Sequence, residues 1–173
     1  IPAAAGTKFV DIPSGVWYSG YVKYLSDYGV AYGRTKDRFA PNEAITRAEF
    51  VAMTVRFFDV YGDGSQEIME RYKDFNDVND GYWAAAYIKA AAKYGWVTGY
   101  TDGTFRGDSE INRAEVVTIV TRLLGREADE SYIADNLRKL NTFSDMSGKH
   151  WAYYAVMEAA NAHDYKTSGT NET

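Results

Sequence analysis

Two arginines occupy the same place in two similar segments of the sequence. Arg47 lies in Ile-Thr-Arg-Ala-Glu, residues 45–49, and Arg113 lies in Ile-Asn-Arg-Ala-Glu, residues 111–115. Each is expected at the first position of a helix, where the helix dipole disfavours a cation by roughly 0.3–1 kcal/mol. We therefore expect a negative group beside each arginine. It is either an internal carboxylate or an external anion, because such a helix terminus binds carboxylates and phosphates well. The internal candidates are Asp11, Asp77 and Asp102.

The residues around the two arginines fit a capping box at the start of a helix. Thr46 and Asn112 are the predicted N-caps, whose side chains accept a hydrogen bond from the amide three residues later. Glu49 and Glu115 are predicted to reach back to the amide of the cap residue. These four residues are thus explained by helix stability, whereas the arginines are not.

Three segments of the chain show the same order of markers. Each opens with a phenylalanine and continues to a tryptophan at the same offset. The interval from Trp17 to Trp83 equals the interval from Arg47 to Arg113, and the interval from Trp83 to Trp151 is only slightly longer. Independent markers therefore share one spacing, which indicates internal repeats. The opening phenylalanines are Phe9, Phe75 and Phe143.

Each repeat is predicted to form a helix, a loop and a second helix. Apolar residues of the first helix recur with the 3.6-residue period of an amphipathic helix. Gly29 and Gly95 are expected to end the first helices, and Asp11 and Asp77 are among the candidate caps that start them. No strand longer than a few residues is predicted, so the expected fold class is all-α.

The repeats are predicted to pack on one another. A helix pair of this size cannot bury its own apolar stripe, so we expect a shared pseudo-three-fold axis or a short stack. Connecting helices are predicted at residues 65–72 and 129–140. The predicted organisation is repeat 1 at 9–58, a linker helix in 59–74, repeat 2 at 75–124, a linker helix in 125–142, and a partial repeat 3 at 143–173.

The composition excludes several classes of function. The 173-residue chain carries a net charge of −5, which argues against nucleic-acid binding. It has no cysteine, and no apolar run approaches the roughly 20 residues of a membrane span. His150 and His163 have no neighbouring ligand set, and no Ser/His/Asp arrangement is present. We therefore predict no enzyme activity, no metal and no cofactor.

The tryptophans and tyrosines leave two interpretations. A tryptophan at the start of an amphipathic helix usually belongs to the core, which is the favoured interpretation here, with one edge exposed. In a carbohydrate site the same residue would be a stacking platform. The chain also has 15 tyrosines, and an excess of amphipathic aromatics suits surfaces that contact sugars or proteins.

The order of these motifs resembles the S-layer homology module. Repeat 2 matches best, through Trp-Ala at 83–84, Gly-Tyr-Thr-Asp-Gly-Thr-Phe at 99–105 and Ile-Asn-Arg-Ala-Glu at 111–115. Repeat 1 keeps Ile-Thr-Arg-Ala-Glu-Phe at 45–50, but its loop reads Gly-Arg-Thr-Lys-Asp-Arg-Phe. Repeat 3 keeps Phe-Ser-Asp and His-Trp-Ala and then departs from the pattern.

The resemblance implies a three-pronged, pseudo-three-fold assembly around a central helical bundle, with an incomplete third repeat. It implies a non-catalytic module on the bacterial cell surface that binds an anionic, pyruvylated polysaccharide of the cell wall. The alternative is a protein–protein assembly module of a surface layer, in which another chain completes repeat 3. Repeat 3 lacks the arginine motif, so at most two arginine-centred grooves are expected. The implied ligand-binding residues are Arg47, Arg113, Trp17, Trp83, Trp151, Tyr100, Asp102 and Gly103.

Overall fold

The described part of the chain folds mainly into helices joined by loops. The computed structural model describes residues 6–62, 72–162, 167–168 and 171–172. The predicted all-α class is confirmed, and the two short strands pair with each other in antiparallel orientation. The elements are α1 (Ser19–Asp27), α2 (Arg47–Tyr61), α3 (Ala85–Lys93), α4 (Arg113–Leu123), α5 (Glu130–Asn136), α6 (Tyr153–Ala160), β1 (Thr167–Ser168) and β2 (Asn171–Glu172).

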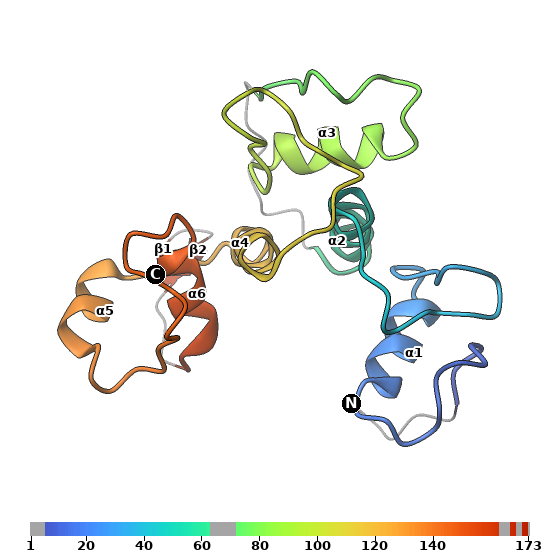
Figure 1. Ribbon diagram of the computed structural model, residues 1–173, viewed down its shortest axis with the longest axis horizontal. Helices are drawn as coiled ribbons and strands as arrows, with labels where there is room; N and C mark the ends of the chain where they lie inside the picture. The colour runs from blue at the N-terminus through green and yellow to red at the C-terminus, as the bar shows by residue number, and fades with distance from the viewer. Residues whose placement is uncertain (1–5, 63–71, 163–166, 169–170, 173) are drawn as a thin grey trace.

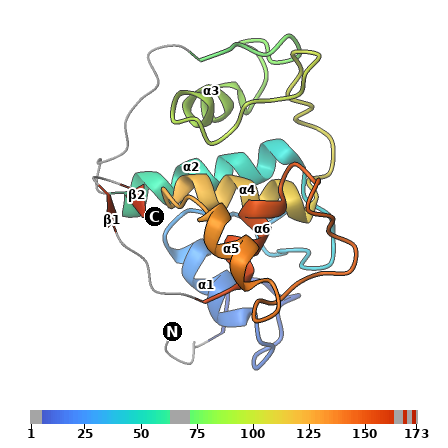
Figure 2. The same ribbon diagram turned by 90° about the vertical axis from the view of Figure 1, so that its left-hand side faces the viewer.

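The second helices of repeats 1 and 2 form the centre of the molecule. Figure 1 shows α2 and α4 end-on, with α1, α3 and the pair α5 and α6 arranged around them. Helix α3 packs on α2, α6 packs on α4, and α2 contacts α4. Figure 2 shows α2 and α4 running side by side between α3 and the other helices. The pseudo-three-fold symmetry itself stays a prediction, because only two such central helices occur among the described residues.

Local sequence signals set the ends of these helices. Thr46 accepts from the amide of Glu49 at 3.2 Å, and Glu49 accepts from the amide of Thr46 at 2.8 Å. Asn112 and Glu115 form the same reciprocal pair at 3.0 and 3.1 Å. Each box satisfies two amides that the first turn of the helix leaves without a partner.

Glycines end the first helices, as the sequence predicts. Gly29 and Gly95 each follow the C-cap residue of α1 or α3 and have φ of 71°. This left-handed conformation carries no steric penalty for a residue without a Cβ atom.

The prediction that Asp11 and Asp77 cap the first helices is wrong. Helices α1 and α3 have no side-chain cap. The Asp77 carboxylate instead accepts hydrogen bonds from the amides of Phe105 and Arg106, both at 2.7 Å. Asp11 holds the corresponding loop of repeat 1 through the amides of residues 39 and 40. Each aspartate therefore ties the start of its repeat to the loop that precedes the second helix.

Paired phenylalanines anchor each loop in the core. Phe75 and Phe105 lie with ring centroids 5.4 Å apart, and Phe9 and Phe39 lie 5.3 Å apart. Repeat 2 shares its core with α2, whereas repeat 1 has a smaller cluster of its own. The buried residues of the shared core are Ala48, Val51, Val55, Phe75, Ala84, Ile88, Ala91, Ala92, Trp96, Val97, Phe105 and Ile119.

The connecting segments match the predictions only in part. Helix α5 lies within the predicted linker helix at 129–140, and α2 continues beyond residue 58 into the predicted linker. The helix predicted at 65–72 lies almost entirely outside the described residues. Within the described part of the chain, no helix is long and apolar enough to cross a membrane.

Candidate functional site

Arg47 joins repeat 1 to repeat 2 in a buried ion pair. Its guanidinium lies 2.8 Å from the Glu115 carboxylate, and its Nε donates to the carbonyl oxygen of Phe105 at 2.9 Å. The rings of Tyr100 and Phe105 lie 4.9 and 4.8 Å from its Cζ atom. Arg47 is only 6% exposed. Of the two partners that the sequence left open, the structure provides an internal carboxylate.

The internal partner is not one of the aspartates named from the sequence. Glu115 both closes the capping box of α4 and neutralises Arg47. Burial opposes its ionisation, but hydrogen bonds from Tyr100 and the Asn112 amide and the charge of Arg47 outweigh that effect. The pKa of Glu115 is therefore held below its ordinary value. The ion pair was missed because its members belong to different repeats and meet only when the repeats pack.

Arg113 has a different environment although it has the same position in its repeat. It is exposed, and no described residue forms an ion pair or hydrogen bond with its side chain. By the spacing of the repeats, residues 99–105 correspond to 167–173 in repeat 3, of which the structure describes only 167–168 and 171–172. Among the described residues, the charge of Arg113 at the N-terminus of α4 therefore has no partner.

All three marker tryptophans are exposed, so the favoured core interpretation is wrong. Trp17, Trp83 and Trp151 are 83%, 54% and 64% exposed. Each lies two residues before the first residue of α1, α3 or α6, so it stands outside the buried stripe of the helix. In repeats 2 and 3 the alanine that follows the tryptophan is buried instead; it is Ala84 or Ala152.

Two equivalent grooves lie between neighbouring repeats. Each combines the loop and second helix of one repeat with the tryptophan of the next repeat. The first groove has a volume of about 410 Å³ and the second of about 470 Å³. The first is lined by Ala31, Tyr32, Gly33, Arg34, Phe39, Ala40, Pro41, Glu43, Ile45, Glu49, Ala52, Met53, Arg56 and Trp83. The second is lined by Arg47, Trp96, Val97, Thr98, Gly99, Tyr100, Thr101, Asn112, Glu115, Thr118, Ile119, Arg122 and Trp151.

Each groove contains an arginine without a carboxylate partner among the described residues. Arg56 and Arg122 come from α2 and α4, and no ion pair involves either of them in the described part of the chain. Arg56 donates from Nε to the hydroxyl of Tyr87 at 3.2 Å. Arg122 donates to the carbonyl oxygen of Trp96 at 3.3 Å. An arginine beside an exposed indole can bind the carboxylate of a ligand while the indole stacks on its ring.

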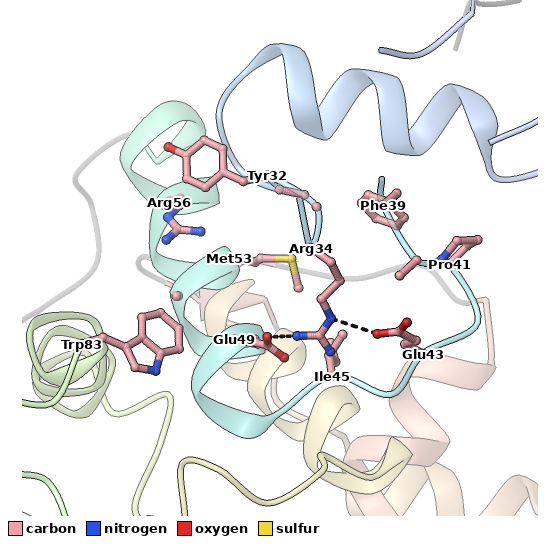
Figure 3. Close-up of a pocket in the computed structure, with 14 residues that line it drawn as sticks. Tyr32, Arg34, Phe39, Pro41, Glu43, Ile45, Glu49, Met53, Arg56 and Trp83 are labelled. Atoms are coloured by element: carbon pink, nitrogen blue, oxygen red, sulfur yellow. Dashed lines mark hydrogen bonds and ion pairs between the residues drawn. The ribbon is translucent and has the colours of Figure 1, made fainter. Parts of the chain in front are cut away.

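The first groove carries additional charges on its loop. Figure 3 shows Arg34 between Glu43 and Glu49, on the side of the groove opposite Arg56 and Trp83. Arg34 forms an ion pair with Glu43 at 3.4 Å and another with Glu49. In the second groove Tyr100 has the corresponding place, and its hydroxyl donates to Glu115 at 2.7 Å. The loops of the two repeats thus hold their capping glutamates in different ways.

The remaining residues predicted from the resemblance lie outside both grooves. Trp17 contacts Tyr18 edge to face, with ring centroids 5.4 Å apart. Asp102 accepts from the Thr104 hydroxyl and pairs with Arg106 at 2.8 Å, and these contacts lower its pKa. Gly103 is buried in the same loop with φ of 84°. Asp102 and Gly103 therefore shape the loop that carries Tyr100.

Three arginines that line the grooves were not predicted from the sequence: Arg34, Arg56 and Arg122. The spacing of the repeats relates two of them, because the interval from Arg56 to Arg122 is the same as the interval from Arg47 to Arg113. Arg56 and Arg122 also follow the motif arginine of their own helix at one common offset. This common offset is the sequence signal for the second arginine of each helix, which lines a groove.

Comparison with known proteins matches the repeats to one family. The family model described as the S-layer homology domain matches residues 8–51 and 74–117, which together make up just over half of the chain. The chain is 31% identical over 91% of its length to a cellulosome-anchoring protein of Acetivibrio thermocellus, of which it covers 33%. It is 29% identical over 94% of its length to cell surface glycoprotein 1 of the same organism, covering 7% of that protein.

A relative from another organism shows the same partial coverage. The chain is 30% identical to S-layer protein EA1 of Bacillus anthracis over 68% of its own length and 13% of the relative. The chain thus spans a third or less of the length of these relatives.

Proposed function

Because the chain belongs to the S-layer homology domain family, whose modules anchor proteins at the bacterial cell surface, we propose that it binds an anionic polysaccharide of the cell wall. The proposed ligand carries pyruvate ketals, and the chain binds it without catalysing a reaction. One observation carries the proposal: in both grooves an exposed tryptophan accompanies an arginine that no described carboxylate neutralises.

The chemistry of a pyruvate ketal fits this pair of side chains. The ketal presents a carboxylate on a sugar ring that has apolar faces. Arginine forms charge-assisted hydrogen bonds with a carboxylate, and an indole covers a flat apolar surface. The net charge of −5 repels a polyanion at long range, so local cations have to supply the attraction. Arg56 and Arg122 are the groove cations without a carboxylate partner among the described residues, and Arg113 is a further exposed cation on α4.

Co-sedimentation with purified pyruvylated wall polysaccharide tests the proposal. We expect the Trp83→Ala, Trp151→Ala double variant to lose at least about tenfold in affinity, by analogy with bases that stack on aromatic side chains and contribute about 1–3 kcal/mol each. The matched control is Tyr132→Ala, which removes an exposed aromatic ring from α5 outside both grooves. Unchanged binding of the double variant would reject the grooves as the site. Trp17→Ala decides whether that exposed tryptophan takes part.

An assembly function is the second candidate, and the exposed face of α4 favours it. Thr54 of α2 is 6% exposed, whereas Val120, its equivalent on α4, is 36% exposed. Arg47 is buried by the loop of the next repeat, while its equivalent Arg113 is exposed. A neighbouring chain that supplies a loop and helix of the repeat type would cover this face. Light scattering that shows a monomer over a wide range of concentrations would reject this second candidate.

A further inference from the structure

The two grooves differ in the side chains that surround their equivalent arginines. In the first groove, the rings of Tyr32 and Tyr87 lie 4.6 and 4.8 Å from the Cζ atom of Arg56. Tyr87 also accepts the Nε hydrogen of Arg56. Much of this guanidinium is therefore engaged by aromatic groups of the protein.

The second groove leaves its arginine more available. By the spacing of the repeats, the residues equivalent to Tyr32 and Tyr87 are Thr98 and Ala155, and neither has a ring. No aromatic ring among the described residues makes a cation–π contact with Arg122. Arg122 is exposed to solvent and has no counter-ion among the described residues, although partial desolvation of its guanidinium lowers its pKa. An accessible guanidinium without a carboxylate partner can form charge-assisted hydrogen bonds with an anionic ligand.

The charged residues on the groove walls also favour anion binding in the second groove. The first groove is lined by two arginines and two glutamates, and the second by two arginines and one glutamate. The additional carboxylate is Glu43, which is exposed and equivalent to Ser109 of repeat 2. The first groove is thus neutral, while the second carries an unbalanced positive charge.

We infer that the second groove binds the anionic sugar residue of the polysaccharide, whereas the first groove binds an uncharged residue. Tyr32, Tyr87 and Glu43 are the residues that set the first groove apart, and Arg122 is the residue that selects the anion. This inference rests on the proposed function, which it divides between two sites of different specificity.

The four tryptophans allow each groove to be observed separately. Trp83 lines the first groove, Trp151 and the fully buried Trp96 line the second, and Trp17 is exposed outside both. Their indole N–H signals in nitrogen–proton correlation spectra report each location. The two probes are methyl glucoside with a pyruvate ketal and the same glucoside without it. We expect the ketal probe to move the Trp151 signal at concentrations about tenfold lower than those that move the Trp83 signal.

Variants identify the residues behind this preference. Arg122→Gln should abolish the preference of the ketal probe for the second groove and leave the Trp83 shifts unchanged. The matched control is Arg138→Gln, which removes the same charge from an exposed position outside both grooves. The Tyr87→Ala, Glu43→Ser double variant should gain ketal binding at Trp83, because it gives the first groove the small, uncharged residues of the second. An unfolding curve for each variant verifies that it is folded.

The outcomes separate this inference from the proposed function. Equal shifts at both tryptophans, or a preference of the ketal probe for Trp83, would overturn the inference and leave wall binding intact. Polysaccharide binding by sedimentation without any indole shift would overturn it as well, because the grooves would not be the site. Failure of both the polysaccharide and the probes to bind would reject the proposed function itself.

Discussion

Arg47 and Arg113 show how one residue type at one position of a repeat can have two roles. The next repeat supplies Arg47 with a carboxylate, a carbonyl oxygen and two aromatic rings. Among the described residues, nothing equivalent reaches Arg113. The first arginine is therefore part of the interface between repeats, and the second is a free surface charge.

The two arginines should differ in their effect on stability. Arg47→Ala leaves the Glu115 carboxylate buried without its partner, so we expect the free energy of unfolding to fall by about 3–5 kcal/mol. Arg113→Ala removes an exposed cation from the positive end of a helix, so we expect a change within about 0.5 kcal/mol. Urea denaturation at neutral pH measures both values. Similar losses in the two variants would contradict the difference in their environments.

The sequence predicted the residues whose roles are local and failed for those whose roles depend on packing. The capping boxes follow from neighbours three positions apart, and they are present. The pairing of Arg47 with Glu115 depends on the contact between repeats, which no local spacing indicates. The exposure of Trp83 depends on where α3 begins. The helix begins at Ala85, two residues after Trp83, so the Trp83 side chain lies outside the buried stripe of the helix.

The loops that carry groove residues are held by contacts at both of their ends. In repeat 2, Asp77 binds the amides of Phe105 and Arg106, and Gly99 lies against the ring of Phe75. Turn glycines and the phenylalanine anchor were recognisable from the sequence. The aspartate contact was not, because Asp77 and Phe105 are 28 residues apart and the aspartate also fits a helix cap.

Gly99 in the loop should tolerate substitution by alanine far less well than a glycine outside the groove. Gly99 has φ of 68°, and a Cβ atom there would lie 2.4 Å from the Phe75 ring and 2.7 Å from the carbonyl oxygen of Thr104. Strain of the left-handed backbone and overpacking together predict a loss of about 3 kcal/mol for Gly99→Ala. The matched control, Gly148→Ala, meets no atom within 4 Å and should change little. Thermal unfolding compares them, and equal midpoints would contradict the close packing of this loop.

The molecule as a whole should lose stability in acid. Besides Glu115, three aspartates have a carboxyl pKa that hydrogen bonds lower below the ordinary value of about 4. The folded chain therefore binds fewer protons than the unfolded chain near that pH. This contribution to stability is complete above the unfolded pKa and is lost as the pH falls through the folded pKa. The groups and their first donors are Asp11 with the Phe39 amide, Asp80 with Lys89, and Asp102 with the Thr104 hydroxyl.

Urea unfolding at a series of pH values from 7 to 2 tests this dependence. We expect the free energy of unfolding to decline steadily below about pH 4. Asp80→Asn should reduce the slope, because the substituted residue no longer titrates. A free energy of unfolding that rises or stays constant from pH 5 to pH 3 would contradict the assigned pKa directions.

Two grooves on one helical framework should make binding of the polymer stronger than binding of its single residues. When one residue of the polymer occupies a groove, the second contact becomes intramolecular, which raises avidity by about 10²–10⁴ if one chain reaches both sites. Trp83→Ala and Trp151→Ala should then each weaken polymer binding by about 100-fold while leaving single-sugar binding at the other groove unchanged. Titration calorimetry with the polysaccharide and with the methyl glucoside, with and without the pyruvate ketal, measures both effects. If each single variant instead halves the binding capacity without changing the affinity, the grooves act independently and one polymer chain does not span them.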